Sequence, residues 1–202
     1  MFDVSEQYRI IIVGDENVGK SSLIHLYTKG YYTNDYKSTI GVDLSFKDLC
    51  FERKNMRLFI WDITGQERFR FLTRIYYNNV SGAILVFDVN NEASFYNCEI
   101  WLHNIYNNGE HLRNNIVLVG NKSDKEKKVK QEEIDYLCSE YNLEYREISV
   151  QENINVYETF QYILKKLVND DTIKERQITD TVEEFRDNNE DNSKKKRCCK
   201  VS

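Results

Sequence analysis

One segment near the N-terminus has the residue types and spacing of a phosphate-binding loop. Residues 14–21 read GDENVGKS, in which Lys20 and Ser21 follow a glycine. In such a loop, backbone N–H groups and the start of the next helix attract phosphate oxygens, the lysine reaches the outer phosphates and the serine hydroxyl ligates Mg²⁺. An apolar run at 8–13 and a helical pattern after the loop supply the context that the motif requires. The predicted nucleotide-binding residues here are Gly14, Asn17, Val18, Gly19, Lys20, Ser21 and Ser22.

Three further polar segments follow apolar or β-branched runs. Residues 62–65 read DITG, residues 121–124 read NKSD, and residues 148–151 read ISVQ. In a parallel α/β sheet, ligands bind at the carboxyl ends of the strands. We therefore expect these segments to lie beside the phosphate loop.

The set of motifs resembles that of the Ras-like small GTPases, and within them that of the Rab family. Thr39 in STIGVD at 38–43 completes the set, which has the family's order and approximate spacing. Segments similar to those that set Rabs apart from other Ras-like proteins occur at 40–43, 68–70, 76–77 and 85–88. The resemblance covers about residues 6–168 and the extreme C-terminus. It implies an enzyme that hydrolyses GTP to GDP and phosphate with Mg²⁺.

Guanine recognition is assigned by this resemblance to the segments that follow the later strands. The Asp124 carboxylate can accept both N–H groups on one edge of guanine, whereas adenine presents a mismatched edge. Asn121 would brace the loop, and the aliphatic stem of Lys122 would cover one face of the base. The other residues assigned to the base are Tyr32, Ser149, Val150 and Gln151.

Magnesium binding and hydrolysis are assigned in the same way. Ser21 and Thr39 would ligate Mg²⁺, with Asp62 acting through a water. The Gly65 N–H would contact the γ-phosphate and Gln66 would orient the attacking water, because such catalysis consists mostly of positioning and charge neutralisation. The predicted catalytic residues are Lys20, Gly65 and Gln66.

Strand-like and helix-like segments alternate along the chain. Strands are predicted at 8–13, 42–51, 56–62, 83–88, 116–120 and 145–149, with a hairpin turn at 52–55, and one amphipathic helix is predicted through 95–105. Such alternation implies βαβ units. The sequence predicts an α/β fold of the P-loop GTPase type, with a mostly parallel six-stranded sheet, one antiparallel strand, helices on both faces and a disordered C-terminal tail.

Composition bounds the class of protein. The 202 residues fit one GTPase domain at 1–168 and a flexible tail at 169–202. The net charge of −5 argues against binding to nucleic acid, and we expect a monomer.

Cys50, Cys98 and Cys138 lie in apolar or helical patterns and are predicted to be small core residues in a reducing compartment. Neither a signal peptide nor a membrane span is expected.

The C-terminus suggests a membrane anchor. Cys198 and Cys199 follow a basic run at 194–197 and resemble Rab termini in which both cysteines carry geranylgeranyl groups. This implies attachment to the cytoplasmic face of endomembrane compartments with cycling through the cytosol. The implied partners are an exchange factor, a GTPase-activating protein, a GDP-dissociation inhibitor, an escort protein and effectors of the GTP form.

Alternatives remain at this stage. A P-loop ATPase or small-molecule kinase is disfavoured by residues 121–124. A switch that binds GTP with little hydrolysis remains possible, because Glu16 and Thr64 stand where smaller residues are more usual in the family. The alternative interpretation of Tyr32 is an exposed loop tyrosine that does not contact the base. The alternative interpretation of the basic run at 194–197 is a nuclear signal.

Overall fold

The computed structural model describes the chain except for residues 1–3, 5, 33–40, 64–73, 78 and 171–202. The chain divides into two units, Met1–Leu164 and Lys165–Ser202, and the sheet belongs to the first. Of the predicted tail, only residues 169 and 170 are described. Within the described residues, no helix is long and apolar enough to cross a bilayer.

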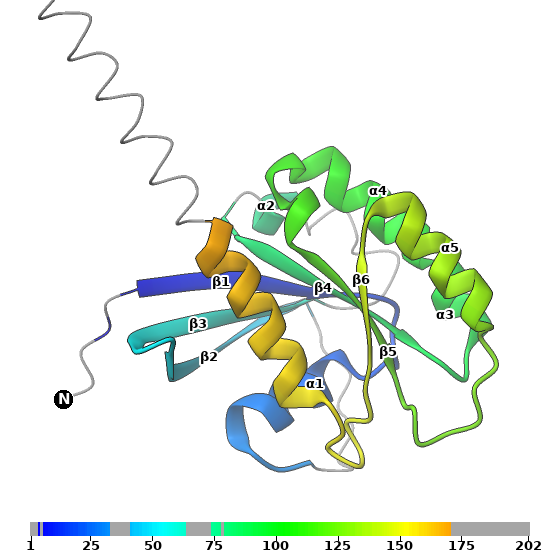
Figure 1. Ribbon diagram of the computed structural model, residues 1–202, viewed down its shortest axis with the longest axis horizontal. Coiled ribbons are helices and arrows are strands. Elements are labelled where there is room, and N and C mark those ends of the chain that lie inside the picture. The colour runs from blue at the N-terminus through cyan, green and yellow to red at the C-terminus, as the bar shows by residue number, and fades with distance from the viewer. Residues whose placement is uncertain (1–3, 5, 33–40, 64–73, 78, 171–202) are drawn as a thin grey trace, which may run out of the picture. The chain divides into compact units, whose positions relative to one another are not determined.

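Six strands form one sheet in the order β2-β3-β1-β4-β5-β6 (Figure 1). Neighbouring strands run parallel except for β2 and β3, which pair antiparallel. The predicted mostly parallel sheet with one antiparallel strand is therefore confirmed. The strands are β1 (Glu6–Val13), β2 (Val42–Phe51), β3 (Lys54–Ile63), β4 (Gly82–Asp88), β5 (Ile116–Asn121) and β6 (Glu144–Glu147).

Helices cover both faces of this sheet (Figure 1). Every residue of β4 and β5 is buried, as two-sided coverage requires. On one face, Trp101 and Ile134 join Leu85 in a continuous apolar cluster. Outside this cluster, Tyr27 of α1 stacks on Phe160 of the helix at 156–170, with ring centroids 3.6 Å apart. The helices are α1 (Lys20–Lys29), α2 (Arg74–Tyr77), α3 (Glu92–Tyr96), α4 (Cys98–Asn108), the 3-10 helix η2 (Glu110–Asn115), α5 (Gln131–Tyr141) and residues 156–170.

The β2–β3 turn is tighter than the sequence predicts. It consists of Glu52 and Arg53 alone, since β3 already begins at Lys54. Both residues have positive φ, 49° and 68°, as a two-residue type I′ turn requires. The prediction of a four-residue turn at 52–55 is wrong, because the polar residues Lys54 and Asn55 stay in the ladder of an edge hairpin.

Other boundaries also differ from those predicted. The helix predicted through 95–105 is divided at Asn97 into α3 and α4. The last strand ends at Glu147, and Ser149 instead forms an isolated bridge with Ile154. Cys98 is buried and Cys138 half-buried, but Cys50 is exposed. The prediction that Cys50 is a core residue is wrong, because β2 is an edge strand with much of its surface open to solvent.

Candidate functional site

The phosphate loop joins β1 to α1 and has two positions where only glycine fits. Gly14 has φ +138°, and a Cβ there would lie 2.1 Å from the Val86 carbonyl oxygen. Gly19 has φ +97°, and a Cβ there would lie 2.3 Å from Asn121 Nδ2. The loop backbone therefore packs closely on β4 and on the end of β5, which leaves no room for side chains at these two points.

Lys20 and Ser21 open helix α1. Lys20 is buried, and its Nζ donates to the Asp15 carbonyl oxygen at 2.6 Å. Burial lowers the pKa of the Lys20 ammonium to about 8, against the opposing charge of Asp62. Ser21 Oγ donates to Asp62 Oδ2 at 2.5 Å, so the first turn of α1 meets the end of β3.

This corner fits a bound Mg²⁺ ion. A hydroxyl and a carboxylate from two different elements lie within hydrogen-bond distance, and hard oxygen ligands of this kind are those that Mg²⁺ takes, usually together with phosphate and water. Ser21 and Asp62 are thus close enough to share one ion. Thr39, the third predicted magnesium residue, lies outside the described residues.

Asn121 connects three segments that are distant in the sequence. It ends β5, and its Nδ2 donates to the Val18 carbonyl oxygen at 2.8 Å. Its Oδ1 accepts from the Val150 N–H at 3.2 Å and from the Lys122 N–H at 2.7 Å. Because the side chain is 1% exposed, these bonds are shielded from water. The NKSD segment is thereby joined to the phosphate loop and to the loop after β6.

Lys122 adds a second connection to the phosphate loop. Its Nζ lies 2.7 Å from the Asn17 carbonyl oxygen and 2.6 Å from Asp88 Oδ2. The lysine itself has φ +68°, a left-handed conformation that is uncommon for a residue with a side chain. Its aliphatic stem therefore extends between β4 and the phosphate loop.

Asp124 is oriented by the loop after β6. Ser149 Oγ donates to Asp124 Oδ1 at 2.5 Å and accepts from the Glu152 N–H at 3.0 Å. Ser149 is fully buried, whereas Asp124 is exposed. A buried hydroxyl thus holds an accessible carboxylate in one orientation.

Of the remaining predicted residues, some are described by the structure and others lie outside the described part of the chain. Tyr32 is 37% exposed, Ser22 is half-buried, Val150 is buried and Gln151 is exposed. Gly65 and Gln66, together with Thr64, lie outside the described residues. Cys198 and Cys199 lie outside them as well.

The sequence reasoning missed a contact between the phosphate loop and α4. The Asp15 carboxylate accepts from Asn97 Nδ2 at 2.6 Å and from Trp101 Nε1 at 2.9 Å. Asp15 occupies a variable position of the motif, and Trp101 falls within the amphipathic helix predicted through 95–105, where an apolar residue is expected to face the core. The available signal was the four-residue spacing of Asn97 and Trp101, which places two hydrogen-bond donors on one face of a helix.

The fold and site define a P-loop protein in which the predicted base loop lies beside the phosphate loop. The Ras family model matches residues 9–169. Ras-related protein RAB1BV of Beta vulgaris is 34% identical over 200 residues, which is 95% of this chain and 92% of that protein. Rab-13 of Bos taurus is 35% identical over 163 residues, 80% of each chain. The GTP-binding protein ypt3 of Schizosaccharomyces pombe is 37% identical over 164 residues, 79% of this chain and 75% of that protein.

The chain therefore belongs to the Ras family of small GTPases, in its Rab branch. It is a GTP hydrolase that uses GTP, GDP and Mg²⁺. Membership of this family implies that the chain interacts with regulatory proteins and effectors in general. The alternative of a switch that binds GTP with little hydrolysis is not favoured, and Glu16 is exposed.

Proposed function

We propose that the chain is a GTP/GDP-switched regulator of vesicle and membrane traffic, attached to the cytoplasmic face of endomembrane compartments and cycling with the cytosol. The observation that carries this proposal is the position of Asn121, which joins the predicted base loop to the phosphate loop and to the loop after β6. A nucleotide bound there would contact all three segments at once. GTP and GDP carry the same base, so the difference between the two states is assigned to the segments that carry Thr39 and Gly65, which would contact the γ-phosphate.

In this proposal Asp124 selects guanine. Ser149 leaves the carboxylate oriented and accessible, so that it can accept the paired N–H groups of the base. The Lys122 stem covers one face of the ring, and Tyr32 contacts its edge. Ser149, Val150 and Gln151 complete the pocket.

Phosphate binding and hydrolysis follow from the corner at the start of α1. Lys20 places its ammonium group against the outer phosphates, in place of its bond to the Asp15 carbonyl oxygen. Ser21 and Thr39 would hold Mg²⁺, with Asp62 acting through a water, and the bound ion would supply positive charge against the phosphates. Gly65 contacts the γ-phosphate and Gln66 positions the attacking water. The segments that carry Thr39 and Gly65 then report the presence of the γ-phosphate to effectors.

Membrane attachment is proposed to depend on Cys198 and Cys199. Two geranylgeranyl chains anchor a protein stably where a single chain binds only marginally. The five basic residues within 194–200 add about 1 kcal/mol each at most on an anionic leaflet. An escort protein would present the chain for prenylation, and a GDP-dissociation inhibitor would extract it, alongside an exchange factor and a GTPase-activating protein.

Cell fractionation tests this function. The full-length chain is expected in the membrane fraction, whereas Cys198→Ser combined with Cys199→Ser should move it to the cytosol while GTP binding stays intact. The matched control is Cys50→Ser, which removes an exposed thiol of β2 and should still sediment with membranes. A double-serine variant that remains in the membrane fraction would show that the anchor lies elsewhere.

If the unmodified chain did not bind GTP, that result would instead refute the assigned nucleotide site. The two failures are therefore separable, because the first concerns location and the second concerns binding. Imaging of the tagged full-length protein then identifies the compartment.

A further inference from the structure

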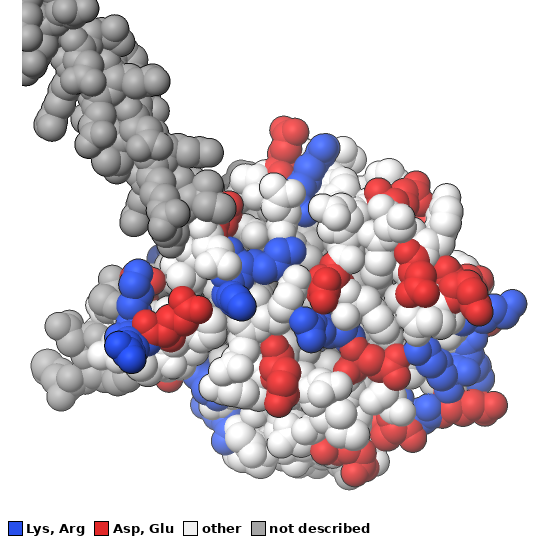
Figure 2. All heavy atoms as spheres, viewed as in Figure 1, with Lys and Arg blue, Asp and Glu red and all other residues white. Residues whose placement is uncertain are grey.

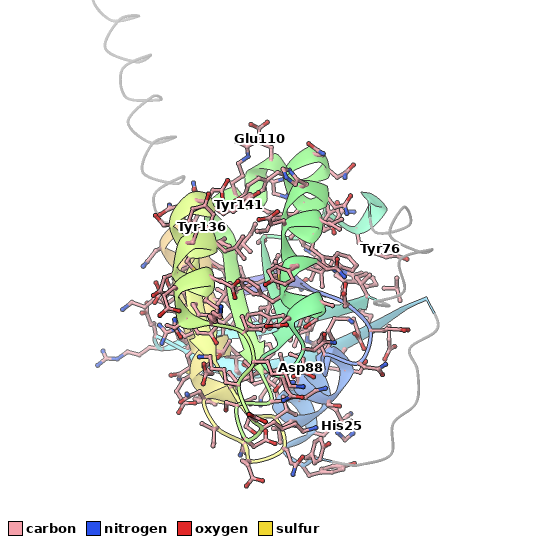
Figure 3. The ribbon with its side chains drawn as sticks, turned by 90° about the vertical axis from the view of Figure 1, so that its right-hand side faces the viewer. His25, Tyr76, Asp88, Glu110, Tyr136 and Tyr141 are labelled. Carbon is pink, nitrogen blue, oxygen red and sulfur yellow. The ribbon has the colours of Figure 1, made fainter. Side chains whose placement is uncertain are left out.

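A groove, here called the α4–α5 groove, lies between α5 and the segment formed by the end of α3 and the first turn of α4. It is on the side of the molecule that faces the viewer in Figure 3, where Tyr136 is labelled. Its volume is about 320 Å³, enough to take one or two side chains of a partner. None of its residues is a candidate for the nucleotide site. The residues that line it are Phe95, Tyr96, Glu99, Glu132, Glu133, Tyr136 and Leu137.

Aromatic rings form much of this groove. Phe95 and Leu137 are buried beneath it, whereas Tyr96 and Tyr136 are 54% and 67% exposed. The Tyr96 hydroxyl donates to Glu133 Oε1 at 3.0 Å, and this bond joins the end of α3 to the first turn of α5. The groove is therefore held in shape by a bond across it and does not need a ligand to form.

The charge of the groove is negative. Glu99 comes from α4 and Glu132 from α5, and both are exposed. Neither Glu99 nor Glu132 makes an ion pair with any other residue that the structure describes, and no lysine or arginine is among the lining residues. Figure 2 shows further acidic side chains over α5 on its visible face. The two carboxylates are thus available to a cation.

Aromatic faces beside carboxylates favour one kind of ligand group. A guanidinium stacks on a tyrosine ring and can donate to a carboxylate in a paired geometry, which the ammonium of lysine cannot do. An arginine anchored in a small aromatic pocket is also a frequent centre of a protein interface. The chemistry of the groove therefore matches an arginine side chain better than an apolar or acidic one.

We propose that the α4–α5 groove binds an arginine-bearing helical or extended segment of a partner protein. The arginine lies against Tyr136 and Tyr96 and pairs with Glu99 and Glu132, while an apolar neighbour contacts Leu137. This interaction is independent of the proposed role in traffic and does not require the γ-phosphate.

A peptide titration tests the proposal on the full-length, GDP-loaded protein. The probe is a short helical peptide with one arginine and a leucine one turn away, and the matched probe has norleucine in place of the arginine. Amide resonances of α4 and α5 should shift with the arginine peptide only. Glu99→Gln combined with Glu132→Gln should weaken binding by about fivefold or more, and Tyr136→Leu should reduce the preference for arginine.

The matched control for the double variant is Glu110→Gln combined with Glu158→Gln, which removes two exposed carboxylates outside the groove. It should bind the arginine peptide as the parent does, and all variants should bind GDP unchanged. Equal binding of the norleucine peptide, or equal weakening in the control, would overturn the proposal. Self-association in sedimentation equilibrium that Tyr136→Leu abolishes would assign the groove to a second copy of the chain instead.

Discussion

Asp124 and Ser149 form the contact on which base selection is proposed to depend. The carboxylate is exposed but fixed by a buried hydroxyl at 2.5 Å, so its orientation is set before any ligand arrives. Preorganisation of this kind lowers the entropy lost on binding. This orientation supports the proposal that Asp124 discriminates between bases by hydrogen bonding.

Asp124→Asn should change the base that the protein prefers. The amide of the variant would present donors to the donors of guanine, so binding should weaken by about 2–5 kcal/mol. Xanthine nucleotides, which carry an oxygen at that edge, should partly restore affinity. Equilibrium titration of the parent and the variant with GDP, ADP and xanthosine diphosphate measures the three affinities. Equal affinity of the parent protein for GDP and ADP would contradict the assignment of the loop.

Gln66 is predicted to affect turnover and not affinity. Gln66→Leu should keep the affinity for GTP and Mg²⁺ but lose most of the hydrolysis stimulated by an activating protein, because only the orientation of water is removed. Single-turnover hydrolysis with and without that protein measures the effect. Hydrolysis at the parent rate would remove Gln66 from the mechanism.

At the scale of elements, α4 supports the phosphate loop. Asn97 and Trp101 both donate to the Asp15 carboxylate, and the Asp15 carbonyl oxygen accepts from Lys20. The helix is therefore connected through one residue to the lysine that is predicted to bind phosphate. A change in α4 can reach the nucleotide through these bonds.

Trp101→Phe should speed the release of GDP severalfold. The substitution keeps an aromatic ring in the core but removes one donor to the Asp15 carboxylate, and a bond to a charged group contributes about 1.5–3 kcal/mol, of which part is felt at the loop. The dissociation rate of a fluorescent GDP analogue gives the readout.

Tyr106→Phe is the matched control for this prediction. It removes another hydrogen bond of α4, that from the Tyr106 hydroxyl to the Tyr141 carbonyl oxygen, and leaves Asp15 untouched. Its GDP release should equal that of the parent. Similar rates in both variants would mean that α4 acts only through general stability.

For the whole molecule, the proposed nucleotide site joins segments that are far apart in the sequence. Asn121 and Lys122 each contact the phosphate loop across more than a hundred positions. A ligand at this junction binds the folded state and not the unfolded chain, so it must raise the free energy of unfolding.

Nucleotide removal should therefore lower thermal stability. GDP at a hundred times its dissociation constant adds about 2.7 kcal/mol to the free energy of unfolding, and chelation of Mg²⁺ should remove part of this. Thermal unfolding of the stripped protein, with GDP, with ADP and with GDP plus chelator, measures the effect. ADP is the control and should leave the midpoint unchanged. An equal increase with ADP would argue against guanine selectivity.

Much of the fold could be predicted because local sequence carries it. The apolar runs of β4 and β5 identify two-faced strands, and the GDENVGKS loop identifies the junction of β1 and α1. The turn at Glu52 and Arg53 could not be bounded in this way, since charged residues there are compatible with either ladder or loop. The break at Asn97 was hidden because apolar periodicity continues through it.

The sequence by itself determined which residues are predicted to bind phosphate, Mg²⁺ and guanine, because the types and spacing within each motif are local properties of the chain. Only the tertiary structure decided which side chains from distant parts of the chain come into contact. Asp15 contacts Trp101, Ser21 contacts Asp62, and Tyr96 contacts Glu133, through the order of the strands and the docking of helices on the sheet. Such contacts join distant positions, and periodicity along the chain contains no information on which distant side chains face each other.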